Sequence, residues 1–279
     1  MQSQTQLSLI QKVRLSLRVS AVVLYFLSGA IFALYFIVRR ALSRGSYSPS
    51  GVTHLWAVGF CKVMGLRIHR YGEPTTATCM MVSNHVSWID IAVFAASTRV
   101  HFLSKIEVRS WPLIGWLAEV AGTLFIKRGG NNAGSVIDDL RNFMQEGNSI
   151  LMFPEGTTTQ GLTVRRFHSK LFIAAIQAGV PVQPMTILYE CDGTLNYDAA
   201  FVGDDDMLSH LIRYLRRPGG RVHLMAHSAI PTYPDSSTAE ITRLASAAVN
   251  AGHAQLIAGL EKPPGPPPEI IKGKRGRFQ

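Results

Sequence analysis

The longest uninterrupted apolar stretch of the chain lies near its N-terminus. Residues 19–38 (VSAVVLYFLSGAIFALYFIV) carry no charge, and cations flank them at Arg18 and at Arg39-Arg40. At about 1.5 Å per residue, a helix of this length reaches roughly 30 Å, the thickness of a bilayer's hydrocarbon core. A signal peptide usually has a shorter apolar region followed by a small-residue cleavage site, so the pattern favours a retained membrane anchor. Whether this helix spans the membrane or re-enters it as part of a hairpin stays open.

A second apolar segment, residues 52–66 (VTHLWAVGFCKVMGL), follows a hinge of Ser, Gly and Pro residues. It has helical character, but it is short and is interrupted by Lys62, so it does not predict a second span. Two interpretations are equally open: a helix that lies in the membrane interface, and a helix that packs on the soluble domain. We assign residues 1–66 to an N-terminal membrane-anchor region.

From residue 67 onward, short apolar runs alternate with helical patterns. This alternation predicts one α/β domain over residues 67–260, with a mainly parallel mixed sheet flanked by helices. Helices are predicted over residues 136–144, between the acidic run 204–206 and Arg216, and after a capping box formed by Ser237 and Glu240. The predicted strands are residues 79–82, 100–103, 123–126, 149–153, 182–187 and 221–226.

The composition indicates a large folded core and a membrane partner. Of the 279 residues, 47% are hydrophobic and 16% are charged, which excludes a largely disordered chain. The formal net charge of +10 suits an anionic partner. Basic residues gather beside the apolar N-terminal segment and in the tail, and no nucleic-acid-binding motif is evident, so we expect membrane lipids and no nucleic acid. Residues 261–279 are rich in Pro and then basic, which predicts a disordered tail.

The three cysteines, Cys61, Cys79 and Cys191, lie far apart and show no CxxC spacing. This pattern predicts neither a disulfide framework nor a zinc site, and it is typical of a reducing compartment. Cys79 falls inside an apolar run, where a small buried residue is a simpler interpretation than a thiol nucleophile.

The segment that suggests chemistry is residues 80–90 (MMVSNHVSWID). Its apolar run ends before His85, and a helical pattern begins at Trp88 with Asp90 in the first turn. At the end of a buried strand, a side chain can stand clear of the core on rigid support. Asp90 would then fix the tautomer of His85 and stabilise its protonated form, which makes a general base that needs no Ser or Cys nucleophile. The structural alternative is that Asp90 merely favours the positive end of a helix dipole.

Three further blocks follow or begin predicted strands. Lys127 and Arg128 end one strand, where Arg128 suits a phosphate or carboxylate. In residues 153–159 (FPEGTTT), Glu155 lies between Pro and Gly, and the hydroxyl and backbone N–H groups that follow can bind an anion or a polar substrate. The last block, residues 180–184 (VPVQP), begins a buried strand. Each block alone has an ordinary structural explanation.

Together and in this order, the blocks N-H-x4-D, G-x-x-F-I-x-R, F-P-E-G-T and V-P-V-x-P resemble those of the glycerolipid acyltransferase superfamily. The chain is most similar to the lysophosphatidic-acid (1-acylglycerol-3-phosphate) acyltransferases. The likeness covers about residues 65–190 and includes a lesser block that begins at Lys105 and Glu107. The N-terminal apolar element also resembles the arrangement in this superfamily.

The resemblance implies a role for each matching residue. His85 would deprotonate the acceptor hydroxyl, Asp90 would orient His85, and the alkoxide would attack the thioester of an acyl-carrier-protein or coenzyme A donor directly. That thioester is a co-substrate, so no cofactor and no metal are implied. The substrate-binding positions that the resemblance implies are Asn84, Phe125, Lys127, Arg128, Glu155, Gly156 and Thr157.

One departure bears on the acceptor. Superfamily members that act on a phosphate monoester often carry Arg after Glu-Gly-Thr, where this chain has Thr158. The cations that would compensate are Arg165, Arg166 or Lys170. The first expectation is transfer to a lysophospholipid, with 1-acylglycerol-3-phosphate giving phosphatidic acid. Transfer to lyso-ornithine lipid or another lysolipid is the alternative.

These features predict a membrane-bound O-acyltransferase of lipid synthesis, with its catalytic domain at the cytoplasmic face of the inner membrane. Two other classes of protein are compatible with the same residues. A metal-dependent hydrolase would use His85, Asp90 and Glu155 as ligands, although no second histidine lies at ligand spacing. A non-catalytic lipid-binding protein would retain the fold without turnover.

Overall fold

A computed structural model describes residues 9–42, 50–110, 114–126 and 133–270. Within these residues one sheet has the strand order β1-β8-β6-β2-β5-β3-β4, and the short β7 pairs with β6. Strand β6 runs antiparallel to β7 and β8, and the other pairs are parallel, so the predicted mainly parallel mixed sheet is confirmed. The strands are β1 (Leu66–Tyr71), β2 (Met80–Ser83), β3 (His101–Lys105), β4 (Leu124–Ile126), β5 (Ile150–Met152), β6 (Val182–Cys191), β7 (Thr194–Leu195) and β8 (Gly220–Ala226).

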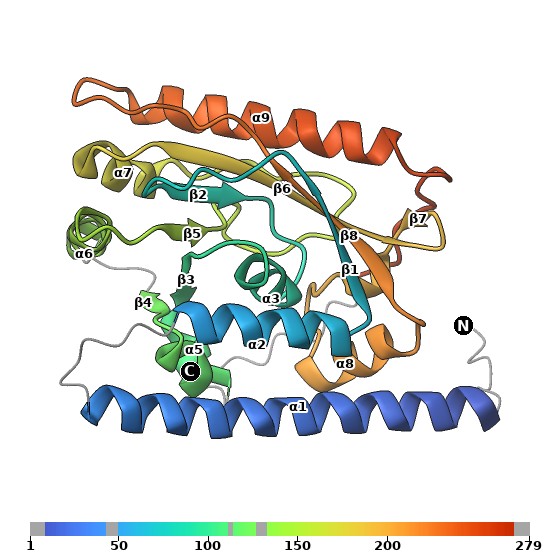
Figure 1. Ribbon diagram of the computed structural model, residues 1–279. Coiled ribbons are helices and arrows are strands. Elements are labelled where there is room, and N and C mark those ends of the chain that lie inside the picture. The colour runs from blue at the N-terminus through green and yellow to red at the C-terminus, as the bar shows by residue number, and fades with distance from the viewer. Residues whose placement is uncertain (1–8, 43–49, 111–113, 127–132, 271–279) are drawn as a thin grey trace, which may run out of the picture.

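Helices cover both faces of this sheet (Figure 1). One apolar cluster joins one face to α2, α3 and α8, and a second cluster joins the opposite face to α6, α7 and α9. The helices are α1 (Leu9–Leu42), α2 (Ser50–Val63), α3 (Ile89–Ala95), α4 (Ile106–Arg109), α5 (Ile114–Val120), α6 (Ala133–Gln145), α7 (Ile173–Ala178), α8 (Met207–Leu215) and α9 (Thr238–Ala258), with 3-10 turns η1 (Lys170–Phe172) and η2 (Tyr197–Ala199).

The apolar pattern predicted the interior strands and the edge strand β4 but missed β1 and β7. The predicted strands correspond to β2–β6 and β8, although β6 extends beyond its predicted end. Strand β1 lies at an edge of the sheet and is mostly exposed, so its sequence (LRIHRY) lacks the continuous apolar run of a buried strand. Half of the predicted capping box is found, because the Ser237 hydroxyl accepts a hydrogen bond of 3.4 Å from the Glu240 N–H. The Glu240 carboxylate instead accepts from the Arg243 guanidinium at 2.7 and 2.8 Å.

Three central strands bring two of the sequence blocks together. Strands β5, β2 and β6 are neighbours and parallel, so their carboxyl ends meet at one edge of the sheet. The loop after β2 carries His85, and the loop after β5 carries Glu155. Strand β6 passes beside the loop after β2, where Ile187 bonds to Asn84. Sheet topology therefore places His85 and Glu155 at one edge, although they are far apart in sequence. The VPVQP block begins β6 and lies at the opposite end of these parallel strands.

Helix α1 lies along the body of the protein, below α2, α5 and α8 in Figure 1. The Arg18 guanidinium donates hydrogen bonds to the carbonyls of Leu215 (2.7 Å) and Met64 (3.0 Å), at the carboxyl ends of α8 and α2. Further along α1, the Tyr25 hydroxyl donates to the Trp56 carbonyl at 2.8 Å. Helix α1 is long and apolar enough to cross a membrane by length and composition, with a mean hydropathy of 2.4 in its most apolar stretch.

Helix α2 packs on the domain, which is one of the two arrangements left open by the sequence. Its residues Ala57, Phe60 and Cys61 are buried in the same apolar cluster as strand β8. The Trp56 and Phe60 rings of α2 stack with centroids 5.4 Å apart. All three cysteines of the chain are buried and unpaired, and burial raises the pKa of the Cys79 thiol to about 11. This agrees with the interpretation of Cys79 as a small core residue.

The first part of the C-terminal tail, residues 261–270, is bonded to the body of the protein, whereas we predicted disorder. The Lys262 N–H donates to the Gly193 carbonyl at 2.8 Å, and the Tyr197 hydroxyl donates to the Gly265 carbonyl at 2.7 Å. Further on, the Gln160 amide donates to the Pro268 carbonyl at 2.6 Å. The Pro-rich composition predicted the absence of regular structure, but these hydrogen bonds join the extended backbone to the body. Residues 271–279 lie outside the described residues.

Candidate active site

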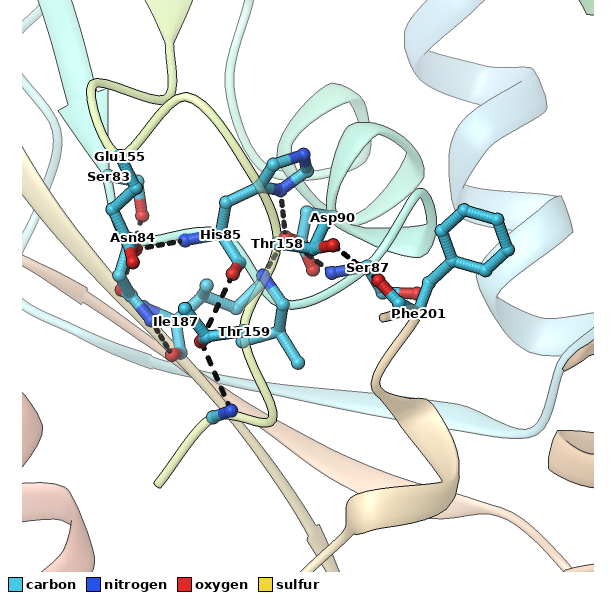
Figure 2. Close-up of polar contacts among 12 residues, drawn as sticks. Ser83, Asn84, His85, Ser87, Asp90, Glu155, Thr158, Thr159, Ile187 and Phe201 are labelled. Carbon is cyan, nitrogen blue, oxygen red and sulfur yellow. Dashed lines mark hydrogen bonds and ion pairs between the residues drawn. The ribbon is translucent and has the colours of Figure 1, made fainter. Parts of the chain in front are cut away.

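The centre of the site is the pair His85 and Asp90, which Figure 2 shows pointing toward each other. The distance between His85 Nδ1 and Asp90 Oδ2 is 2.7 Å. Because a carboxylate oxygen only accepts, Nδ1 carries the hydrogen and Nε2 keeps its lone pair. The His85 ring stacks on Phe153, with centroids 3.9 Å apart and an interplanar angle of 8°. Among the described residues nothing bonds to Nε2, so this nitrogen is available to accept a proton.

Asp90 is fully buried and makes four hydrogen bonds. Oδ2 accepts from the backbone N–H groups of Val86 (2.8 Å) and Ser87 (3.0 Å) as well as from His85. Oδ1 accepts from the Tyr189 hydroxyl at 2.7 Å. The loop from 85 to 90 thus closes on its own carboxylate, which fixes the orientation of the imidazole. This geometry explains the five-residue spacing between His85 and Asp90.

The Glu155 carboxylate holds the backbone of the same loop. Its Oε1 accepts from the His85 N–H at 2.7 Å, and its Oε2 accepts from the Arg165 N–H at 2.9 Å. The residue is 4% exposed, and burial raises the pKa of its carboxyl group to about 7, with the nearby Asp90 charge adding to the rise. Gly156 follows with a φ of +73°, in the left-handed region that favours glycine. The conformation of this turn therefore aims Glu155 at the two backbone donors.

Substituting Glu155→Gln is expected to lower kcat/KM for acyl transfer roughly 10-fold. A glutamine oxygen accepts only one of the two backbone N–H groups, and its amide nitrogen opposes the other. The exposed Glu146→Gln loses the same charge away from the site and serves as the matched control. Equal activity of the two variants would show that Glu155 does not position His85.

The raised pKa of Glu155 also predicts how stability depends on pH. The unfolded carboxyl has its ordinary pKa of 4.5 and the folded one about 7, so the folded state binds the proton more tightly in this window. The free energy of unfolding of the wild type, relative to Glu155→Gln, should therefore rise as pH falls from about 7 towards 4.5. Urea unfolding of both proteins across this range measures the difference, and a difference that falls or stays flat would contradict the assignment.

Asn84 lies beside His85 but faces the sheet. Its amide donates to the Ile187 carbonyl and its oxygen accepts from the Ile187 N–H, both at 2.9 Å. The residue is 1% exposed, and it is not part of the cavity wall. The structure thus gives Asn84 a positioning role, fixing β6 to the end of β2, instead of the substrate contact that we expected. Its two bonds satisfy the strand backbone at a point where the ladder between β2 and β6 ends.

Thr158 occupies the position where superfamily members that act on a phosphate monoester often carry Arg. Its hydroxyl donates a short hydrogen bond to the Phe201 carbonyl, and the Phe201 N–H donates to the Val86 carbonyl at 3.0 Å. The neighbouring Thr159 N–H donates to the His85 carbonyl at 2.9 Å. Through Phe201, Thr158 therefore connects the loop after β5 to the loop that carries His85, and it contributes no charge to the site.

A cavity of about 1590 Å³ opens in front of His85. It exceeds the roughly 300–1,000 Å³ of ordinary small-molecule sites. Its wall is mostly apolar and combines side chains from the anchor region with others from α3 and α5, such as Phe26, Trp56, Ile91 and Leu117. Charged or polar side chains at its wall include Glu107, Arg165, His168 and Lys170. The cavity can therefore accept long apolar chains and a polar head at the same time.

The remaining predicted residues are only partly described. Glu155, Gly156 and Thr157 line the cavity, and Thr157 is exposed there. The Gly156 N–H donates to the Phe153 carbonyl at 3.1 Å, so it is engaged within its own turn. Phe125 on β4 is half-buried and is not in the cavity wall, whereas Ile126 next to it is. Lys127 and Arg128 lie outside the described residues.

The oxygens that a metal-dependent hydrolase would use are already occupied. Glu155 accepts two backbone N–H groups, and Asp90 accepts four donors. Within the described part of the chain no group of three potential ligands is arranged around a metal position. These residues therefore do not fit the metal-binding alternative.

Comparison with known proteins identifies the family. A family model described as "Acyltransferase" matches residues 67–188. A lyso-ornithine lipid O-acyltransferase of Pseudomonas aeruginosa is 40% identical over 240 residues, which covers 85% of this chain and 93% of that protein. This chain belongs to the glycerolipid acyltransferase superfamily. The 1-acyl-sn-glycerol-3-phosphate acyltransferase of Neisseria gonorrhoeae is 33% identical to this acyltransferase over 130 residues, 45% of this chain and 50% of that one.

The solved structure of a 1-acyl-sn-glycerophosphate acyltransferase, PlsC, from Thermotoga maritima has the same fold as this acyltransferase. Its TM-score is 0.67 at 21% sequence identity, and the match covers 90% of this chain and 100% of that one. The α/β architecture predicted from the alternating pattern is therefore that of an acyltransferase. The relatives are named acyltransferases, and this supports an enzyme that transfers acyl groups over the non-catalytic lipid-binding alternative.

Sequence reasoning missed two residues of the site, Tyr189 and Phe153. Phe153 begins the FPEGT block, but the block gives no sign that its ring stacks on His85. Tyr189 belongs to no block and lies 99 residues from Asp90 in sequence, so only the strand arrangement brings it to the carboxylate.

Proposed function

We propose that this acyltransferase moves a fatty acyl group from an acyl-carrier-protein or coenzyme A thioester to the hydroxyl of a lyso-ornithine lipid. The observation that carries the choice of acceptor is Thr158, whose hydroxyl bonds to a backbone carbonyl where enzymes for phosphate monoesters often have Arg. Relatives named lyso-ornithine lipid O-acyltransferase, from Pseudomonas aeruginosa and Rhodobacter capsulatus, match 85% and 87% of this chain. The first expectation, 1-acylglycerol-3-phosphate, becomes the second candidate.

The charges of the cavity wall are consistent with this acceptor. An ornithine head group acylated on its α-nitrogen carries a carboxylate and a primary ammonium group, and it has no phosphate. Arg165 and Lys170 supply cations that suit the carboxylate, and the exposed carboxylate of Glu107 suits the ammonium group. The Arg165 backbone bonds to the same carboxylate as the His85 backbone, which keeps the Arg165 backbone close to the loop that carries His85.

The reaction follows from the geometry of His85. Nε2 accepts the proton of the acceptor hydroxyl while the oxygen attacks the thioester carbonyl carbon. The buried Asp90 carboxylate stabilises the imidazolium that forms, through the 2.7 Å bond to Nδ1. The C–S bond then breaks, and the leaving thiolate takes the proton back from Nε2. Positioning two lipid chains in one cavity supplies much of the remaining acceleration.

An acceptor panel tests this proposal. The purified enzyme is given a labelled acyl thioester with lyso-ornithine lipid or with 1-acylglycerol-3-phosphate, and product formation is followed. We expect kcat/KM at least about 10-fold higher for lyso-ornithine lipid, since the loss of one charge-assisted contact to phosphate is worth about that factor. Thr158→Arg should lower the ratio of kcat/KM for lyso-ornithine lipid to kcat/KM for 1-acylglycerol-3-phosphate. A wild-type preference for the phosphate acceptor would overturn the assignment.

We also propose that α1 lies in the membrane interface at the cytoplasmic face. From Arg18 to Ala33, about 22 Å of helix, α1 contacts the body or lines the cavity, so a perpendicular span would bury the polar domain in hydrocarbon. Its opposite face exposes large apolar side chains, including Leu24 at 65% and Ile31 at 71%. The cytoplasmic face is the side on which soluble acyl thioesters are available.

Replacing both Leu24 and Ile31 by Asp should weaken binding to lipid vesicles roughly 10-fold or more, because each charge must leave the apolar layer. Co-sedimentation with vesicles measures this binding. Leu244→Asp on α9, at the opposite side of the molecule in Figure 1, is the matched control and should bind like wild type. Unchanged sedimentation of the double variant would place the membrane contact elsewhere.

A further inference from the structure

Strand β6 contributes a side chain to the catalytic pair that no sequence block marks. The Tyr189 hydroxyl donates to Asp90 Oδ1 at 2.7 Å, and Tyr189 is 1% exposed. The other oxygen, Oδ2, accepts from His85 and two backbone N–H groups. Tyr189 is therefore the one partner of Oδ1 among the described residues.

The same strand also fixes the other side of the loop. Ile187 exchanges two backbone hydrogen bonds with the Asn84 side chain, one residue before His85. Strand β6 therefore holds the loop at two points, Asn84 through the Ile187 backbone and Asp90 through the Tyr189 side chain. Burial and the Asp90 charge raise the pKa of the Tyr189 hydroxyl well above its ordinary value, which keeps the hydroxyl protonated as a donor.

Tyr214 on α8 gives an internal comparison. It is also 1% exposed and belongs to the same apolar cluster as Tyr189. Its hydroxyl has no hydrogen-bond partner in the described structure. A buried tyrosine in this core therefore does not require a partner for its hydroxyl, and the contact between Tyr189 and Asp90 calls for a separate explanation.

We propose that Tyr189 is a positioning residue whose hydroxyl holds the Asp90 carboxylate in place and sets the strength of His85 as a base. A hydrogen bond to Oδ1 disperses the negative charge that Asp90 presents to the imidazole. Without it, Asp90 attracts the proton on His85 more strongly, so the imidazolium is favoured and the neutral base is formed only at higher pH. The carboxylate also loses one of the contacts that fix its orientation.

Other titratable groups near His85 and Asp90 could also change the pH dependence of the reaction. Those that face this pair or its cavity are Glu155 from the loop after β5, Cys61 of α2, Tyr214 of α8, and the cavity side chains Glu107, Arg165, His168 and Lys170. Tyr189→Phe removes only one oxygen and changes none of these groups. The inference depends on His85 acting as the base of the proposed reaction.

The test compares Tyr189→Phe and Tyr214→Phe with wild type, using the acceptor that the wild-type enzyme prefers. Tyr189→Phe should lower kcat roughly 10-fold with little change in the acceptor KM. It should also move the acidic limb of the kcat/KM profile to higher pH by about half a unit or more. Tyr214→Phe should keep the wild-type profile. A wild-type pH profile for Tyr189→Phe, or equal shifts for both variants, would overturn the proposal.

A double-mutant cycle keeps the test informative if Tyr189→Phe is poorly stable. In an Asp90→Asn background, Tyr189→Phe should cause no further fall in kcat, because its effect runs through the carboxylate. The same fractional loss in both backgrounds would show a general packing defect and overturn the role. Absence of wild-type turnover across the acceptor panel would instead refute the proposed function, so the two failures are distinguishable.

Discussion

Replacing His85 by alanine should lower kcat for acyl transfer roughly 10²–10⁴-fold, the usual contribution of a general base. The structure supports this size of effect because His85 lines the cavity and its Nδ1 is held by Asp90. The imidazole makes one side-chain hydrogen bond, to Asp90, so the fold should persist. Label transfer from a thioester to the lipid measures kcat, and thermal unfolding measures the fold.

His69→Ala is the control for this substitution. His69 is exposed on the edge strand β1, away from the cavity, so its loss should leave kcat within a factor of about two. Residual activity of His85→Ala within 10-fold of wild type would mean that another group takes the proton.

Substituting Asp90→Asn should lower kcat by a similar order, roughly 10²–10⁴-fold, while the acceptor KM changes little. Asp90 is fully buried and does not line the cavity, so it does not contact the acceptor. An asparagine amide cannot accept from all the donors that meet Oδ2, and it favours the His85 tautomer with the hydrogen on Nε2. That tautomer has no lone pair for the acceptor hydroxyl.

Asp206→Asn provides the matched control, because asparagine also caps a helix and Asp206 caps α8. This variant should keep both kinetic constants. If Asp90→Asn raised the acceptor KM and left kcat unchanged, Asp90 would act on substrate binding and the orienting role would be wrong.

The sequence was sufficient for the local parts of the site. His85 and Asp90 belong to one short loop and the helix that follows, so their spacing alone predicted that they meet. The alternation of apolar runs predicted a mainly parallel sheet, and parallel strands gather their carboxyl ends at one edge. The ordered blocks then predicted the superfamily to which the chain belongs.

The parts that were missed depend on contacts between distant segments. Asn84 was expected at the substrate, yet its side chain bonds to β6. Glu155 lines the cavity, but its bonds to the backbone of His85 and Arg165 were not predicted. From sequence alone, an acidic or amide side chain in a loop is interpreted as a substrate-binding group, because the backbone groups that it bonds to are not known. The docking of α1 along the body depends in the same way on Arg18 reaching the ends of α2 and α8.

The central claim is that His85 takes a proton from the lipid hydroxyl and never carries the acyl group itself. Incubating the enzyme with a labelled acyl thioester, without any acceptor, and then denaturing it tests this claim directly. The account predicts no stoichiometric label on the protein, and rapid labelling of lipid once the acceptor is added. A labelled protein that forms within one turnover, and is absent in His85→Ala, would show that His85 is a nucleophile and would contradict the account.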